Sequence, residues 1–547
     1  MDKKKTVLTY GEVFEYPPET DNIFRLFLLA VTGITIIIGN YIPSFLFETE
    51  SSPLSIIPLT EFYDVDKVFS TSPDEFYRNA LLFIKPIAIQ FSFVIFIFGL
   101  SYFIYRRKPA KIIRQNNLTL ISDTEVIETL NALKKKSGLT LNLNYYVNGN
   151  IRDFSAQVFG TGNRIYLKAG RGLVKIMLKK NYDMFENIIL HEFSHIKNKD
   201  IGKTYFAGSF LKTPFLITLI TASAVMFYAL IKNITGRIIS NDFTVLSLMG
   251  KISVYLNLFL QVAVLLILLF VIFRMLIRSR EYYADLRAAS LKSTDTMISY
   301  FKKAGEKVTE QNFFEKLSGF HPSLKLRYET LADPVKIFRP SEKLLFINTL
   351  VSYIFFAGAF IYGLSLLLMI FTITGYSMLF LLKGFLNEYV HLMLVYIELI
   401  FGTIFMALFL LFCGSLMRKS FFFQVDKIHI FNKYADNKIS VLPAIIRLSL
   451  TASIGIVCGY MLLPLYGFNV LHFKNILSVP FVFVITFAGF FVINYFHYFW
   501  MDSKINNEYK VDYSVPVLLG LFEGILIVII FLTAILSFQF FTTLLFV

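Results

Sequence analysis

The chain has 547 residues, of which 55% are hydrophobic, 17% aromatic and only 17% charged. Because a soluble domain carries roughly a quarter charged residues, this composition excludes a soluble globular protein and indicates an integral membrane protein. The 53 Lys and Arg residues exceed the 38 Asp and Glu residues by 15. In a membrane protein such an excess lies mostly in cytoplasmic loops beside anionic lipid, so we expect no nucleic-acid partner.

Apolar runs long enough to cross roughly 30 Å of hydrocarbon recur along the chain. They predict about nine membrane-spanning helices, near Leu26–Phe47, Pro86–Tyr105, Tyr205–Ile231, Ile252–Phe273, Leu345–Ile373, Leu392–Phe412, Leu448–Leu465, Ile476–Trp500 and Pro516–Val547. The first two runs form an N-terminal anchor with an external loop over residues 1–105. The last five form a C-terminal membrane bundle over residues 343–547.

Basic residues beside the runs predict the orientation. The segments RRKPAKIIR, RSR and MRKS follow the second, fourth and sixth runs and belong on the cytoplasmic side. The acid-rich loop between the first two runs fits the outside. We therefore expect a cell-membrane protein with its N-terminus inside and its C-terminus outside.

Two segments, residues 106–203 and 278–342, are too polar for the membrane, and by this topology both face the cytoplasm. We interpret them as the halves of one split domain over residues 106–342, separated by two spans. The first half begins with a helix at Ser122, and LTLNLNYYV (Leu139–Val147) then alternates like a half-buried strand. FSAQVFGTGNRIYL (Phe154–Leu167) predicts two strands around a turn at residues 160–163. We therefore predict a helix, a small sheet and a second helix in this half.

The segment MFENIILHEFSHIKNKD carries His191 and His195 four residues apart on a stretch with helical apolar spacing. Both imidazoles therefore project from one face and can bind one ion. The only cysteines, Cys413 and Cys458, lie inside apolar runs, so the ligands must be nitrogen and oxygen atoms, and we predict one Zn²⁺ per chain. Glu192 can take a proton from a water that zinc activates and return it to the leaving amine.

A catalytic zinc site needs a third protein ligand. The segment RSREYYADLRAAS follows the fourth apolar run and holds Glu281 and Asp285 one helical turn apart. We predict that Glu281 is the third ligand. Asp285, on the same face, can accept a hydrogen bond from the free ring nitrogen of a liganding histidine and fix its tautomer.

With FHPSLKLR further along, these segments resemble the integral-membrane zinc metallopeptidases of the HtpX-like and CAAX-prenyl-endopeptidase family, which are gluzincins. The resemblance covers roughly residues 122–331 and leaves the C-terminal runs uncovered. It implies a metalloendopeptidase with H-E-x-x-H and E-x-x-x-D motifs. The implied fold class is a mainly α, polytopic membrane protein with a split cytoplasmic α+β zinc-metalloprotease domain.

The resemblance also implies roles for residues outside the two motifs. The family has an aspartate five residues after the second histidine, a strand that pairs with extended substrate, and a later His-Pro followed by Arg, whose histidine is thought to help polarise the scissile carbonyl. These features fall on Asp200, on Ser155 and Ala156 as substrate-binding residues, on His321 as a catalytic residue, and on Arg327 as a substrate-binding residue. Here Ser155-Ala156 stands where the family usually shows Asn-Ala.

Three further polar residues, Glu398, His497 and Glu523, lie inside apolar runs of the C-terminal region. Ionisable residues are costly in lipid and are therefore functional candidates. They could line a substrate path, or they could pair with neighbouring helices or lie near a helix end.

The sequence thus predicts a membrane-embedded zinc metalloendopeptidase that hydrolyses membrane or membrane-associated polypeptides at the cytoplasmic membrane surface. Proteolytic quality control is the favoured role, and precursor processing is the enzymatic alternative. A sensor-transducer protease that cleaves a regulator would carry a large external sensor domain, whereas the longest outside loop here has only about 33 residues. A transporter-like protein with a non-catalytic metal would need a closed four-ligand site.

Overall fold

The computed structural model describes residues 8–16, 18–46, 73–162, 164–212, 245–292, 295–306, 319–356, 421–462, 478–507 and 521–530, with isolated residues between 216 and 235 and at positions 414 and 418. The longer helices are α1 (Glu19–Leu46), α4 (Pro73–Gln115), α5 (Thr124–Lys136), α7 (Tyr182–Lys197), α8 (Asp200–Lys212), α10 (Val245–Leu291), α11 (Asp295–Glu306), α13 (Leu324–Ala332), α16 (Val441–Leu462) and α18 (Ser478–Asn507). The described part is mainly helical with one small mixed sheet, as the sequence predicts.

The strands and short helical segments complete the described elements. They are η1 (Glu12–Glu15), β1 (Thr119–Leu120), β2 (Leu143–Val147), β3 (Ala156–Thr161), β4 (Arg164–Ala169), η2 (Leu173–Met177), α6 (Leu178–Lys180) and η3 (Pro334–Phe338). Further helical segments cover residues 342–356, 421–434 and Leu521–Ile530.

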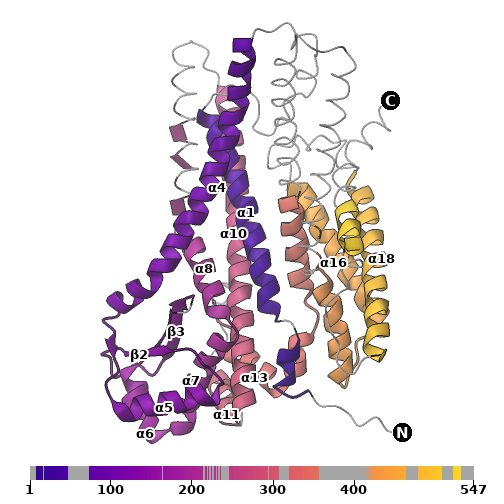
Figure 1. The fold of residues 1–547 in the computed structure, drawn as a ribbon. Helices are drawn as coiled ribbons and strands as arrows, with labels where there is room; N and C mark the ends of the chain where they lie inside the picture. The colour runs from indigo at the N-terminus through magenta and orange to yellow at the C-terminus, as the bar shows by residue number, and fades with distance from the viewer. Residues whose placement is uncertain are drawn as a thin grey trace, which may run out of the picture.

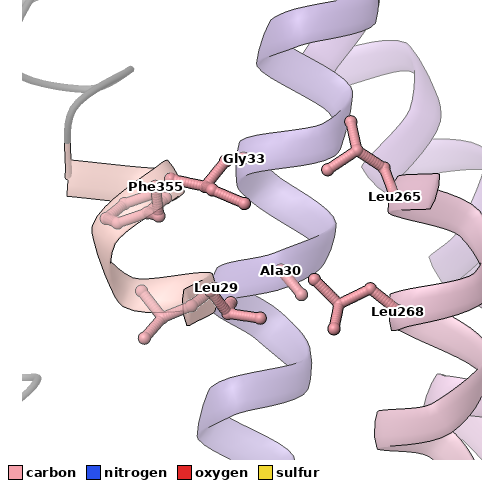
Figure 2. Close-up of a pocket in the computed structure, with 8 residues that line it drawn as sticks. Leu29, Ala30, Gly33, Leu265, Leu268 and Phe355 are labelled. Atoms are coloured by element: carbon pink, nitrogen blue, oxygen red, sulfur yellow. The ribbon is translucent and has the colours of Figure 1, made fainter. Parts of the chain in front are cut away.

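Three long helices, α1, α4 and α10, pack together, and the sheet with α5, α6 and α7 lies at one end of them (Figure 1). Apolar side chains of α1 and α10 share one large core. Figure 2 shows Leu29, Ala30 and Gly33 of α1 between Leu265 and Leu268 of α10 on one side and Phe355 on the other, around a small apolar pocket. Gly33 faces Phe355 of the helix at residues 342–356, where an added Cβ would lie in ordinary van der Waals contact, 3.6 Å from the ring. The helix at residues 342–356 therefore packs against α1.

The sheet has the strand order β1-β2-β4-β3, with β2 parallel to β4 and the other pairs antiparallel. The predicted hairpin is confirmed as β3 and β4, whereas the predicted strand Leu139–Val147 forms only from Leu143. Gly160 has a φ of +155°, and an added Cβ would lie 2.2 Å from the Arg164 carbonyl oxygen. Only glycine fits there, so this residue allows β3 to turn into β4.

Helix α7 lies against this sheet. Phe185, Ile189 and Phe193 recur at four-residue intervals and pack in one buried cluster with Val158 and Phe159 of β3. Because His191 and His195 share a different face of the same helix, packing on the sheet turns both imidazoles toward α10, which also contacts α7. The apolar pattern of α7 thus orients the metal-binding motif.

Among the described residues, two helices are long and apolar enough to cross a membrane, Val441–Met461 and Val479–Ser503. They overlap two of the nine predicted spans. Three other predicted spans fall within or largely within α1, α4 and α10. The spans predicted at Tyr205–Ile231, Leu345–Ile373, Leu392–Phe412 and Pro516–Val547 lie wholly or partly outside the described residues. The number nine therefore stays a prediction.

Candidate metal centre

The H-E-x-x-H motif lies in the last turns of α7. The helix begins at Asn181, whose side chain accepts a hydrogen bond of 3.2 Å from the Met184 N–H and so satisfies a free donor of the first turn. The rings of His191 and His195 meet edge to face, with centroids 4.8 Å apart. Both rings are buried, so a solvated helix face is excluded.

The carboxylate of Glu281, from α10, lies between these rings. Its Oε2 is 3.6 Å from His191 Nε2, and its Oε1 is 3.6 Å from His195 Nε2. One ligand atom from each residue lies within 4.8 Å of the others, and no other such group of three occurs among the described residues. Two helices thus bring together predicted ligands that lie more than 80 positions apart in the chain.

The opposite nitrogen of each ring faces a second carboxylate. His191 Nδ1 lies 2.9 Å from Asp285 Oδ1, and His195 Nδ1 lies 3.1 Å from Asp200 Oδ2. A carboxylate at Nδ1 favours the tautomer with its proton on that atom. The Nε2 of each ring faces Glu281, on the side where a metal would be bound.

This donor set fits zinc. Two ligands about 2.1 Å from one ion in a tetrahedral arrangement are roughly 3.4 Å apart, close to the two 3.6 Å nitrogen–oxygen distances. Two histidines and one glutamate are also a ligand set of catalytic zinc sites, in which a fourth position stays open. The buried cluster can therefore hold one catalytic Zn²⁺ per chain.

The surrounding charge favours a cation at the same place. Burial acts to lower the pKa of His191, but its contacts with Asp285 and Glu281 outweigh this and raise the pKa to about 10. Burial acts to raise the pKa of Glu281, whereas the neighbouring imidazoles of His191, His321 and His195 hold it well below its usual value. An excess of carboxylates around two imidazoles thus attracts positive charge.

Glu192 connects the motif helix to the sheet. Its Oε2 accepts a hydrogen bond of 2.8 Å from the Val158 N–H of β3. Because β3 is the last strand in the sheet order, this bond comes from a strand edge beside the cluster. It fixes one carboxylate oxygen and leaves Oε1 for proton transfer. No sequence pattern indicated this role of the Val158 N–H.

Arg327 of α13 forms a bidentate pair with Asp285. Its Nε and Nη2 donate to the two carboxylate oxygens at 2.7 and 2.6 Å, and its guanidinium lies 4.6 Å from the Phe301 ring centroid. Two donors of Arg327 are thus engaged in holding Asp285 against His191. Its predicted contact with substrate stays a prediction.

His321 lies at the open side of the cluster. Its Nδ1 is 3.5 Å from Glu281 Oε2, and its side chain is 69% exposed. Arg274 and Arg278 of α10 hold the preceding segment by donating to the Gly319 carbonyl at 2.9 and 3.1 Å. The histidine can therefore reach a molecule bound at the cluster, and its role toward a carbonyl stays a prediction.

Ser155 and Ala156 lie at the start of β3. The N–H and the hydroxyl of Ser155 both donate to Asp153 Oδ1, at 2.9 and 2.6 Å, and its carbonyl accepts from the Gly170 N–H. Ala156 pairs with Ala169 of β4. Ser155 thus holds the loop before the edge strand, and the predicted binding of substrate by both residues stays a prediction.

Arg280 is a further residue of the site that the sequence interpretation treated only as a membrane flank. Its Nε lies 3.1 Å from His195 Nδ1, 3.5 Å from Asp200 Oδ1 and 3.8 Å from Glu281 Oε1. Since the Nδ1 that faces Asp200 carries a proton and cannot also accept one, we assign the guanidinium to Asp200 and Glu281. Its position directly before Glu281 was the available signal.

The polar residues of the C-terminal region form a separate buried network. His497 Nδ1 lies 2.7 Å from Glu523 Oε1 and its Nε2 lies 3.0 Å from Asp426 Oδ1, while Arg418 Nη1 donates to Glu523 Oε2 at 3.0 Å. His497 and Glu523 therefore pair with each other and with neighbouring helices. This was one of the two alternatives for these residues, the other being a substrate path. Glu398 lies outside the described residues.

The comparisons with known proteins concern the part of the chain that forms this cluster. A model described as Peptidase family M48 matches residues 121–335, a range that contains His191, His195 and Glu281. No curated protein and no solved structure matches the chain.

Proposed function

We propose that this chain hydrolyses peptide bonds of membrane or membrane-associated polypeptides at the cytoplasmic membrane surface. Residues 121–335 match Peptidase family M48 and contain a buried His-His-Glu zinc site. The chain is therefore a zinc metalloendopeptidase. The proposal includes about nine membrane-spanning helices and a protease region over residues 106–342. Residues 1–105 and 343–547 form the membrane parts on either side.

The observation that carries the proposed chemistry is the position of Glu192, buried directly after His191 in α7 and anchored at one oxygen by the Val158 N–H. Bound zinc acts as a Lewis acid toward water and the scissile carbonyl. Glu192 takes a proton from the attacking water and transfers it to the leaving nitrogen. Asp200 and Asp285 hold the two imidazoles in the ligating tautomer.

The edge position of β3 supports an extended polypeptide substrate. The strand ends the sheet, so in the described residues its outer side has no partner strand, and Glu192 accepts from the Val158 N–H of this strand. An extended chain can add to such an edge through main-chain hydrogen bonds, which depend on the backbone conformation of the substrate more than on its sequence. Binding of this kind favours proteolytic quality control of unfolded segments, with precursor processing as the narrower role.

The length of α10 supports a site at the membrane surface. This helix runs from Val245 to Leu291 and changes from apolar residues to the polar segment RSREYYAD near its end. Glu281 therefore lies about two helical turns beyond the predicted span Ile252–Phe273. A substrate held in or on the bilayer would reach the cluster without leaving the membrane surface.

The test compares the wild type with Glu192→Gln, both purified in detergent with zinc. The variant retains shape and ligands but loses the base, so we expect one zinc per chain by metal analysis and a loss of cleavage of an unfolded polypeptide by about 10²–10⁴-fold. The exposed Glu128→Gln on α5 is the matched control and should cleave like the wild type. Equal cleavage by wild type and Glu192→Gln would contradict the assignment of the base.

A second comparison addresses the substrate class. The same unfolded segment is offered free in solution and fused to a membrane helix in the same vesicles as the enzyme. We expect faster cleavage of the membrane-anchored form, and equal rates would contradict the membrane-surface proposal. Cleavage of many unrelated unfolded segments would favour quality control, whereas cleavage of few would favour processing.

A further inference from the structure

The last turns of α10 are packed on both faces. At 100° per residue, Glu281 and Asp285 share one face, and Tyr283, Leu286 and Arg287 lie on the opposite one. Tyr283 and Leu286 are fully buried in a cluster with Leu8, Val13 and Tyr16. The ligand-bearing face therefore meets α7, while the opposite face meets the beginning of the chain.

We call residues 8–21 the N-terminal brace. Its Phe14 ring meets Tyr283 edge to face at 6.2 Å, and the Arg287 guanidinium lies 3.6 Å from the centroid of the same Phe14 ring. The Glu19 N–H donates to the Tyr283 hydroxyl at 3.2 Å. The brace thus fixes the side chain two positions after the zinc ligand Glu281.

The C-terminal region holds the brace from its other side. Lys427, in the helix at residues 421–434, is only 1% exposed, and its ammonium group forms an ion pair with the Glu19 carboxylate. The hydroxyls of Tyr16 and Tyr434 are 3.0 Å apart. Figure 1 shows that this end of the chain lies between the foot of α10 and the C-terminal helices.

A buried ammonium group is costly unless it is paired. Lys427 therefore favours the arrangement in which Glu19, in the first turn of α1, lies directly beside it. Glu19 in turn places the Tyr283 hydroxyl through its N–H. The chain of contacts runs from the C-terminal helix through the brace to the turn of α10 that carries Glu281.

We propose that Glu19 and Lys427 are positioning residues for the metal centre, through which the C-terminal membrane region holds Glu281 in place for zinc binding. This assigns a role to a region that the Peptidase family M48 match does not include. The proposal rests on the zinc site and not on the identity of the substrate.

The test measures zinc affinity by competition with a chromogenic chelator, for the full chain in detergent and below the unfolding temperature of each variant. We expect Lys427→Met to weaken zinc binding by about tenfold or more and Lys427→Arg to stay within about twofold of the wild type. The exchange Glu19→Lys with Lys427→Glu should recover most of the affinity. A merely structural pair would lower the unfolding temperature without this pattern.

Arg418→Met is the matched control, because it breaks another buried pair of the same region, that with Glu523, and both members of this pair lie outside the brace. We expect it to lower the unfolding temperature and leave zinc affinity within about twofold. Equal weakening of zinc binding by Arg418→Met and Lys427→Met would overturn the proposal. So would a folded Lys427→Met protein with the zinc affinity of the wild type.

Tyr283→Phe keeps the test decisive if Lys427→Met does not fold, since it removes only the hydroxyl that accepts from Glu19. We expect a zinc affinity about threefold lower, and an unchanged affinity would contradict the proposed path. Because zinc binding is measured apart from cleavage, failure of the proposed substrate class would leave this result interpretable.

Discussion

Asp200 and Asp285 make equivalent contacts to the two zinc-binding histidines but differ in their own supports. Asp285 receives two hydrogen bonds from Arg327, and Asp200 lies beside Arg280. Each carboxylate is thus held by an arginine while it faces an imidazole Nδ1. The site therefore consists of three layers: ligands, carboxylates and arginines.

Replacement of Asp285 by asparagine tests the middle layer. The substitution Asp285→Asn keeps the size of the side chain, but a neutral amide cannot accept the imidazole proton with full charge, so we expect zinc affinity to fall by about 10–100-fold. Chelator competition at neutral pH measures this change, with Asp295→Asn of α11 as a control outside the site. An affinity within about twofold of the wild type would show that Asp285 does not support His191.

Among single residues, the sequence predicted the zinc ligands because their relation is local. A spacing of four places His191 and His195 on one helix face whatever surrounds them. The carboxylate at Glu281 followed from the ligand number that zinc requires. The position of Arg280 could not be predicted in this way, because the same residue suits a membrane flank and a buried site equally well.

At the scale of elements, α7 is tied to its neighbours by charge as well as by the sheet. Glu186 pairs with Lys136 of α5 at 2.7 Å and with Lys292 just after α10. Burial acts to raise the pKa of Glu186, but the two ammonium groups outweigh it and lower the pKa below its usual 4.5. The ionised carboxylate therefore stabilises the contact of α7 with both partners.

This shift predicts a pH dependence with a definite sign. A lowered folded-state pKa stabilises the protein above the unfolded pKa of about 4.5, and this stability is lost as the pH falls through the folded value. We expect Glu186→Gln to lower the unfolding temperature most between about pH 5 and 7, with the difference shrinking below about pH 4.5. Thermal unfolding in a chelator, so that zinc does not contribute, measures it. A difference that stays constant from neutral pH into the acid range would argue against it.

The elements themselves were only partly predictable. The hairpin of β3 and β4 has a local turn signal and was predicted, with Gly160 in the position that needs a glycine. The parallel pairing of β2 with β4 joins two strands that are not consecutive in the chain. No local sequence pattern specifies this pairing. Strand β1 has two residues, too few for an alternation to be detected.

At the scale of the whole molecule, the protease domain is bordered by helices that the family match does not include. Helix α1 packs against α4 and α10, and the N-terminal brace joins α10 to the helix at residues 421–434. The N-terminal brace and the helix at residues 421–434 thus meet behind the turn of α10 that carries Glu281. The proposed orientation in the membrane should therefore be tested with the full chain.

Cysteine labelling tests that orientation. After Cys413 and Cys458 are replaced by serine, a single cysteine is placed at the exposed Asn150 or, in a second variant, at Ser52 of the predicted external loop. We expect a membrane-impermeant maleimide to label Asn150→Cys only in inside-out vesicles and Ser52→Cys only in intact cells. The opposite pattern would reverse the proposed topology and place the metal centre outside.

Composition and local spacing were sufficient to predict the membrane character, the zinc ligands and the family resemblance, because these depend on properties within single helices or short segments. The sheet order, the burial of Arg280, the pairing of His497 with Glu523, and the brace that joins Glu19 to Lys427 became visible only in the folded chain. The pair of Glu19 and Lys427 connects residues 408 positions apart. Such contacts form because helices pack to bury apolar surface and to pair buried charges, which no local pattern encodes.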